Sequence, residues 1–256
     1  MSNTFSTTAL VLKRRDYQEH DRLFCLYAQD YGKIDVLAKG TKKITSKLNS
    51  YLEPFYLIKV MIAKGKFFDK LANCDLIKSY QSLRQDLFGF YLLNYIAEIT
   101  DGLIVGQTQK NDKFSLLVEL LDILDANINF PKDKLFFLVN TYALKLLGLL
   151  GYQPEIKRCL HCHKGILLTK NIFDFGQGGI ICENCKKVCL IEDYIMVADG
   201  VIKLLQSTND LSFSSLLVQP TLAPDLQQFN AVIIRLITAN LEREIISCQI
   251  IKNTLD

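Results

Sequence analysis

Residues 159–185 read C-L-H-C-H-K-G-I-L-L-T-K-N-I-F-D-F-G-Q-G-G-I-I-C-E-N-C. They contain two C-x-x-C pairs, Cys159 with Cys162 and Cys182 with Cys185, separated by nineteen residues. Because C-x-x-C lets two thiolates from one tight turn reach the same ion, this spacing is typical of a tetrahedral four-cysteine zinc site. Four thiolates leave no open position for water, so the sequence predicts a structural Zn²⁺ rather than a catalytic one.

Three other potential ligands lie within or beside these pairs. Cys189 could replace Cys185, and His161 or His163 could replace one of the thiols, so the ligand set stays open from the sequence alone. The remaining cysteines stand in apolar surroundings, where small buried side chains are expected rather than reactive thiols. They are Cys25, Cys74 and Cys248.

The charge is distributed unevenly along the 256 residues. The net charge is +3, but residues 1–80 carry fourteen Lys or Arg against eight Asp or Glu, a net charge of +6. A basic first third ahead of a mildly acidic remainder indicates that the N-terminal part meets a polyanion. The alternative is a solvated basic face with no partner.

The chain has the composition of an ordinary globular protein, with 49% hydrophobic and 22% charged residues. Half of its eight cysteines lie in the C-x-x-C pairs, and the first residues lack the basic and apolar regions of a signal peptide. No run approaches eighteen consecutive apolar residues. We therefore expect a cytoplasmic protein, with no membrane partner, whose thiolates bind metal.

Residues 1–80 predict a domain of five short strands with alternating apolar residues. The expected strands are 9–12, 22–28, 34–38, 54–61 and 67–77. We expect Lys13–Asp16 to form a loop and residues 63–66 to form a hairpin turn. Five short strands indicate a small closed or partly open barrel. A five-stranded OB-fold is the obvious candidate, although strand count alone does not separate it from an SH3-like barrel.

Residues 81–256 change to helical spacing and predict an α-helical domain, with a zinc-binding insertion at about 155–190. The expected helices are 83–105, broken near Gly102, then 114–124, 131–152, 201–206, 213–218 and one long helix over 224–248. The predicted fold class is therefore α+β and multidomain, with a small barrel before a helical domain that carries a four-cysteine knuckle.

Basic side chains gather in the loops and hairpins of the predicted barrel. The candidate DNA-binding residues are Lys13, Arg14, Arg15, Arg22, Lys39, Lys42, Lys43, Lys47, Lys64 and Lys66, with Lys70 nearby. Lys and Arg neutralise phosphates, and aromatic rings give unpaired bases a surface on which to stack. The interleaved aromatics are Tyr17, Tyr31, Tyr51, Phe67 and Phe68. Phe67 and Phe68 cannot both point outward from one strand.

Catalytic signatures are absent from the sequence. It has no H-x-E ahead of the cysteine pairs, no G-x-S-x-G, no Walker loop and no G-x-G-x-x-G, so we do not expect an enzyme. Two other interpretations remain. The basic barrel could belong to a protein–protein adaptor that binds acidic tails, or the metal could serve a zinc-dependent enzyme acting on nucleic acid.

Four segments carry a resemblance to a known family. They are A-L-V-L-K-R-R-D-Y-Q-E-H-D-R-L (residues 9–23), Y-G-K-I-D-V-L-A-K-G (31–40), G-Y-Q-P-E-I-K-R-C-L-H-C (151–162) and F-G-Q-G-G-I-I-C-E-N-C (175–185). In this order, and over nearly the whole chain, they resemble the RecO family of bacterial recombination mediators.

The resemblance implies a fold and a set of partners. The fold is an N-terminal OB-fold, a helical C-terminal domain and a zinc knuckle. Members of the family bind single- and double-stranded DNA and anneal complementary strands. They work with RecR and engage the C-terminal tail of single-strand-binding protein, so that RecA loads onto covered DNA. A protein of this kind would be cytoplasmic and associated with the nucleoid.

Overall fold

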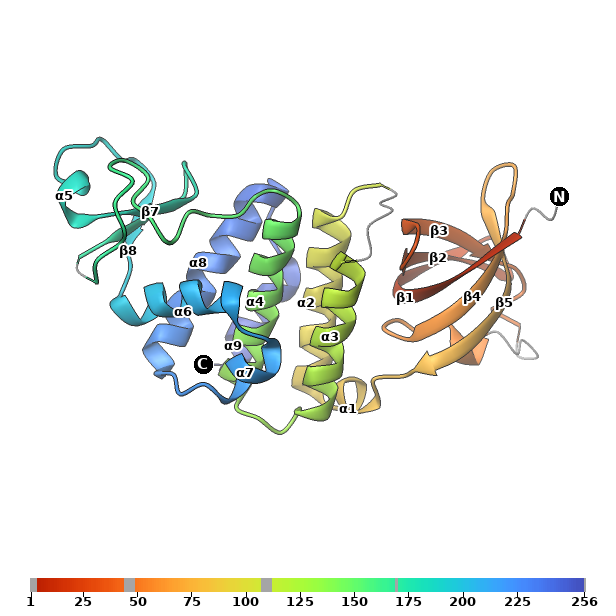
Figure 1. Ribbon diagram of the computed structural model, residues 1–256. Helices are drawn as coiled ribbons and strands as arrows, with labels where there is room; N and C mark the ends of the chain where they lie inside the picture. Colours follow the sequence, from red (N-terminus) through yellow and green to blue (C-terminus); the bar gives the residue numbers. More distant parts are fainter. Residues whose placement is uncertain (1–3, 44–48, 107–111, 169, 256) are drawn as a thin grey trace. The chain divides into compact units, whose positions relative to one another are not determined.

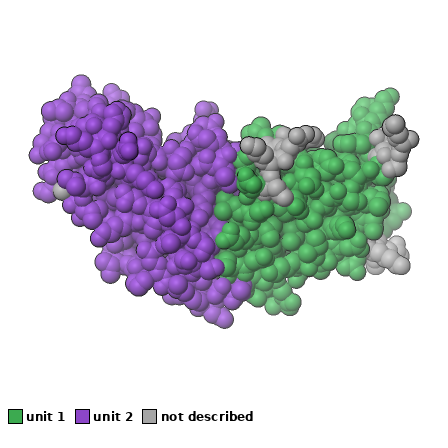
Figure 2. All heavy atoms as spheres, in the orientation of Figure 1, with its two compact units in different colours: residues 1–125 green, residues 126–256 purple. Residues whose placement is uncertain are grey.

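The computed structural model describes residues 4–43, 49–106, 112–168 and 170–255. The chain divides into two compact units, residues 1–125 and 126–256 (Figure 2). Helices α1 to α3 thus fall with the barrel in the first unit, and the predicted domain boundary after residue 80 stays a prediction. Within the described ranges, none of the helices combines the length and the apolar character needed to cross a membrane.

A closed five-stranded barrel forms the N-terminal part of the first unit (Figure 1). Its strands are β1 (Thr4–Tyr17), β2 (Asp21–Ala28), β3 (Gly32–Ala38), β4 (Leu57–Ala63) and β5 (Asp69–Lys78), with the short helix η1 (Asn49–Tyr51) before β4. The strand order is β1-β2-β3-β5-β4; β3 and β5 pair in parallel and all other neighbours are antiparallel. This closed barrel of five strands confirms the predicted OB-type architecture.

Alternation along the strands separates an apolar interior from a charged exterior. Phe24 and Leu26 of β2 and Val36 of β3 belong to the buried interior cluster, whereas their chain neighbours Leu23 and Leu37 do not. Because successive side chains of a strand point to opposite faces, the outer face of β1, β2 and β3 carries the odd-numbered residues from Lys13 onward.

The strand predictions need several corrections. Strand β1 begins at Thr4 rather than at residue 9, and β5 begins at Asp69 rather than at residue 67. Lys13–Asp16 are not a loop, because β1 stays paired with β2 as far as Tyr17, beyond a register shift between Val11 and Lys13. Strand β4 begins at Leu57 rather than at residue 54, since Phe55 lies in a turn with φ of 70°. The expected hairpin between β4 and β5 is present.

Three helices complete the first unit: α1 (Gln81–Gln85), α2 (Leu87–Leu103) and α3 (Asp112–Ala126). The helix expected over 83–105 is interrupted at Asp86, whereas Gly102 lies inside α2, which ends at the next residue. The Asp86 carboxylate accepts a hydrogen bond of 2.7 Å from the Gly89 N–H and so caps α2. The helix predicted over 114–124 is confirmed as α3.

The second unit consists of helices and a small sheet. The helices are α4 (Lys132–Leu149), α5 (Glu183–Lys186), α6 (Asp199–Asp210), α7 (Phe213–Val218), α8 (Ala223–Leu241) and α9 (Ile246–Leu255). The sheet has the order β7-β6-β8, formed by Ile172–Asp174 (β6), Gly179–Ile181 (β7) and Tyr194–Met196 (β8). Helices α4 and α8 pack through Phe137 and Phe229, whose ring centroids are 4.8 Å apart.

The prediction of one helix over residues 224–248 was wrong. Helix α8 ends at Leu241, Glu242 adopts φ of 52°, and α9 begins at Ile246. Glycine usually occupies this left-handed position at a helix end, and a residue with a side chain rarely does. Because Glu242 stands there instead, the sequence gives no sign of the break. Helix α6 is also longer than the segment 201–206 that was expected.

Candidate metal centre and nucleic-acid interface

The four paired cysteines come together as predicted. The Sγ atoms of Cys159, Cys162, Cys182 and Cys185 all lie within 4.8 Å of one another, with 3.9 Å between those of Cys162 and Cys182. A tetrahedral Zn²⁺ with Zn–S bonds of about 2.3 Å requires sulfur–sulfur distances of about 3.8 Å. The cluster therefore fits a single metal ion of this kind. Cys189, His161 and His163 do not join it.

Backbone amides shape the site around Cys159. The Cys182 N–H points at the Cys159 Sγ at 3.4 Å, and the Cys159 carbonyl accepts from the His163 N–H. Burial raises the pKa of the Cys159 thiol, but hydrogen bonds from the amides of Cys182, Cys162 and His161 outweigh it and lower the pKa to about 6. These amides thus favour the thiolate, which is the form that binds a metal.

A glycine allows the chain to fold closely over the metal segment. A Cβ atom on Gly179 at the start of β7 would lie 2.7 Å from the carbonyl oxygen of Glu155. That oxygen accepts a hydrogen bond from the Ile180 N–H, which ties the chain ahead of the first cysteine pair to β7. A larger side chain at position 179 would push these two segments apart.

The outer face of the barrel carries Lys13 and Arg15 of β1. Lys13, Cys25 and Asp35 are cross-strand neighbours on β1, β2 and β3. Two residues further along, Arg15, Leu23 and Leu37 form the next row, which Lys70 of β5 extends. Two hollows lie along this face and meet at the Leu23–Leu37 pair, since each hollow is lined by one of the two leucines.

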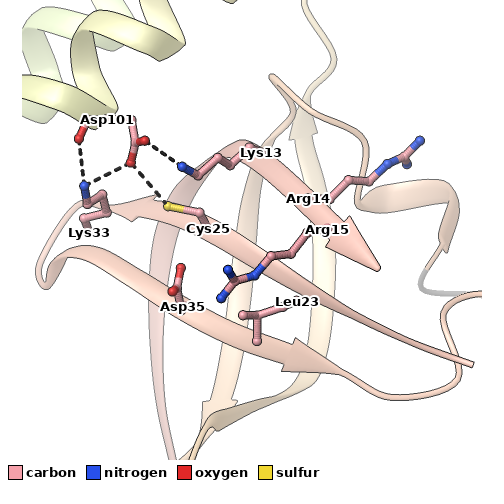
Figure 3. Close-up of a pocket in the computed structure, with 8 residues that line it drawn as sticks. All are labelled: Lys13, Arg14, Arg15, Leu23, Cys25, Lys33, Asp35 and Asp101. Atoms are coloured by element: carbon pink, nitrogen blue, oxygen red, sulfur yellow. Dashed lines mark hydrogen bonds and ion pairs between the residues drawn. The ribbon is translucent and has the colours of Figure 1, made fainter. Parts of the chain in front are cut away.

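The first of these, here termed the Asp101 hollow, has a volume of about 420 Å³ (Figure 3). Its lining residues are Lys13, Arg14, Arg15, Leu23, Cys25, Lys33, Asp35 and Asp101. Asp101 of α2 accepts from Lys13 Nζ at 2.6 Å and from Lys33 Nζ at 2.9 Å, and its carbonyl oxygen accepts from Lys33 at 2.7 Å. Burial raises the pKa of Asp101, but these two lysines outweigh it and lower the pKa.

We predict that Asp101→Asn destabilises the first unit by about 1 to 2 kcal/mol at pH 7, because two charge-assisted hydrogen bonds to lysine are weakened. Since the pKa of Asp101 is lowered on folding, its contribution is complete above the usual aspartate pKa and is lost as the pH falls through the folded value. Urea unfolding followed by circular dichroism, from pH 7 downward, measures the difference.

The matched control is Asp35→Asn, which changes an exposed carboxylate in the same hollow. It should leave the free energy of unfolding nearly unchanged. A difference between wild type and Asp101→Asn that grows in acid would contradict the assignment.

The second hollow, here termed the loop hollow, has a volume of about 250 Å³. It is lined by Tyr17, Gln18, Asp21, Leu37, Lys39, Lys66, Phe67, Phe68 and Lys70. These residues come from the β1–β2 turn, the β3 end and the β4–β5 hairpin. In OB-folds, this sheet face and these two loops bind oligonucleotides.

The predicted DNA-binding residues divide into paired and free cations. Ion pairs hold Lys13 (to Asp101), Arg14 (to Glu53), Arg22 and Lys42 (both to Asp16) and Lys64 (to Asp69), at 2.6 to 3.3 Å. Within the described residues, no ion pair holds Arg15, Lys39, Lys43, Lys66 or Lys70. Lys47 lies outside the described residues. Lys33, which also lines the Asp101 hollow, was missed from the sequence.

The three other cysteines are buried, as expected. Burial raises the pKa of Cys25 to about 12 and that of Cys74 to about 11, and Cys248 is 3% exposed. Thiols of this kind stay protonated at neutral pH and do not act as nucleophiles.

A closed OB-type barrel with basic residues on its outer face, followed by a helical unit whose four clustered cysteines can hold a metal ion, defines a class of two-module proteins. Residues 1–80 match the family model described as "Recombination protein O N terminal", and residues 84–243 match "Recombination protein O C terminal". These matches span most of the chain, which therefore belongs to the recombination protein O (RecO) family.

Curated relatives carry the name DNA repair protein RecO. The chain is 30% identical to the one from Dehalococcoides mccartyi strain BAV1 over 212 residues, which are 83% of this chain and 81% of the relative. It is 28% identical to that of Pelotomaculum thermopropionicum over 79% of this chain and 76% of the relative. It is 32% identical to that of Thermoanaerobacter sp. strain X514 over 72% of this chain and 71% of the relative.

Proposed function

We propose that this protein is a mediator of DNA repair and homologous recombination that binds single- and double-stranded DNA and anneals complementary strands. One observation carries the proposal. The outer face of the barrel brings the free cations Arg15, Lys39, Lys66 and Lys70 onto one surface, beside the aromatic residues of the loop hollow. The family and the names of the relatives support a role in DNA repair.

The proposed mechanism is electrostatic. Each cation that neutralises a phosphate releases a condensed counterion, and this gain drives binding without regard to sequence. Cations along one face also lower the repulsion between two DNA strands held near each other, so complementary strands meet and pair. None of these steps requires a catalytic group, and we propose that the protein is not an enzyme.

The remaining family properties are proposed for this chain as well. We propose RecR and the C-terminal tail of single-strand-binding protein as partners, and an indirect action on RecA, which would load onto DNA freed of that protein. Exposed apolar side chains of the helical unit, such as Val218, Leu222 and Ile246, offer surface for protein contacts. We propose that the metal is Zn²⁺ in a structural role, and that the protein works in the cytoplasm at the nucleoid.

The salt dependence of DNA binding tests the proposal. If all four free cations contact phosphates, the logarithm of the affinity for single strands should fall against the logarithm of the salt concentration with a slope of about −3, since each contact contributes about −0.7. Fluorescence anisotropy of labelled oligonucleotides gives this slope, and energy transfer between labelled complementary strands gives the annealing rate. An affinity that does not change with salt would contradict the proposal.

A basic face also suits an acidic peptide, so an adaptor function is the second candidate. Competition separates the two functions. An acidic peptide that displaces a labelled oligonucleotide from the wild-type protein only at concentrations far above those of an unlabelled oligonucleotide would favour DNA as the main ligand. The opposite order would favour the adaptor.

A further inference from the structure

The β4–β5 hairpin is a tightly constrained loop. A Cβ atom on Gly65 would lie 1.8 Å from the Phe68 carbonyl oxygen, so the observed conformation requires glycine at this position. The Asp69 carboxylate accepts from the Gly65 N–H at 3.2 Å and pairs with Lys64 Nζ at 2.8 Å. These contacts join the two ends of the loop and leave Phe67 between them.

The two phenylalanines of the hairpin have different environments. The Phe68 ring packs edge-on against Tyr17, with 5.5 Å between the ring centroids, and is half-buried. Phe67 is 87% exposed. Both residues lie before the start of β5, so the alternation of a strand does not govern them. Phe68 anchors the loop to the end of β1, and Phe67 stands in solvent.

Three lysines line the same hollow as the exposed ring. Lys66 Nζ lies 5.8 Å from the centre of the Phe67 ring, and Lys39 and Lys70 line the same hollow. An exposed apolar ring is unfavourable in water, and a nucleobase stacked on it would remove one face of the ring and one face of the base from water. The lysines would neutralise the phosphates on either side of a stacked base.

We propose that Phe67 stacks on an unpaired nucleobase and makes the loop hollow selective for single-stranded over double-stranded DNA. The inference rests on the proposed DNA binding of the barrel and names the ligand of this hollow. In a duplex, each base is already stacked on its neighbours and offers no free face. A duplex therefore contacts the cations of this surface without using Phe67.

Four forms of the 256-residue chain test this role: wild type, Phe67→Ala, Phe67→Leu and Phe67→Tyr. Leucine keeps an apolar side chain but has no aromatic face, and tyrosine keeps the ring. Tyr152→Ala, which removes an exposed aromatic residue of the second unit, is the control. Each form is titrated with three labelled ligands of equal length, which are a thymidine oligonucleotide, the same backbone without bases, and a duplex.

Loss of one stacked base should weaken single-strand binding roughly tenfold in Phe67→Ala and Phe67→Leu, while Phe67→Tyr and Tyr152→Ala stay within about twofold of wild type. Affinity for the duplex and for the abasic backbone should change less than twofold in every form, and the salt slope should stay constant. Circular dichroism confirms that all forms are folded.

Three results would overturn the inference. The first is equal loss of single-strand and duplex binding in Phe67→Ala. The second is unchanged single-strand binding in that variant while the wild type binds DNA in a salt-dependent manner, which would reject the stacking role and leave the proposed function standing. The third is the absence of salt-dependent DNA binding by the wild type, which would reject both.

Discussion

Replacing Cys159 or Cys182 by serine is expected to release the metal ion and to unfold the segment around the cluster. The buried residues packed around the cluster are Cys159, Ile172 and Ile181, with a few half-buried side chains on them, and Phe173, Ile180 and Val197 of the same segment are buried as well. Few apolar side chains surround the cluster itself, so we expect metal–thiolate bonds to supply a large part of the free energy that keeps this segment folded. Structural zinc contributes about 10 kcal/mol or more in small domains.

Metal content and protease resistance measure this effect. The wild type should hold one equivalent of zinc and resist limited proteolysis between residues 155 and 197. The cysteine variants should hold much less metal and be cut there. The strands β6, β7 and β8 lie within this segment, so the variants should also lose β-structure that the barrel does not account for.

Cys189→Ser is the matched control, because it makes the same atomic change beside the cluster. Cys189 is the next cysteine after Cys185, its N–H donates to the Cys185 carbonyl at 3.1 Å, and its thiol does not join the four. This variant should keep its zinc and its resistance to protease. A Cys159→Ser protein that retains a full equivalent of metal would show that the cluster does not depend on this thiolate.

Features that depend on short segments of sequence were predictable. The spacing of two C-x-x-C pairs by itself predicts a metal site, and the structure places those four thiols together. The barrel followed from alternating apolar residues, because an interior side chain must recur at every second position. Helix α7, at Phe213–Val218, was predicted with its bounds.

Features that depend on distant partners were not predictable. Lys13 to Asp16 look like a loop because all four are polar or charged, and only their pairing with β2 shows that they continue a strand. Asp101 lies 88 residues from Lys13 in the sequence, so no local sequence pattern predicts that it pairs with this lysine. Only the structure could therefore divide the cations into paired and free residues. This division changes which lysines we expect to contribute to DNA affinity.

The largest loss of DNA affinity is expected from the triple variant Lys39→Ala, Lys66→Ala and Lys70→Ala. These three free lysines line the loop hollow and have no ion pair within the described part of the chain. Their removal should weaken single-strand binding on the order of tenfold to a hundredfold and reduce the magnitude of the salt slope by about 2, since each phosphate contact contributes about 0.7.

A second triple variant makes the same change of charge at paired lysines. It replaces Lys13, Lys42 and Lys64, each of which is held by an aspartate. Both variants lower the net charge by three, so the long-range attraction of DNA falls equally, and only direct phosphate contacts distinguish them. The paired triple should therefore change the salt slope by less than about 1. Equal slopes for the two variants would mean that the free lysines do not contact phosphates, and the loop hollow would lose its place in the DNA interface.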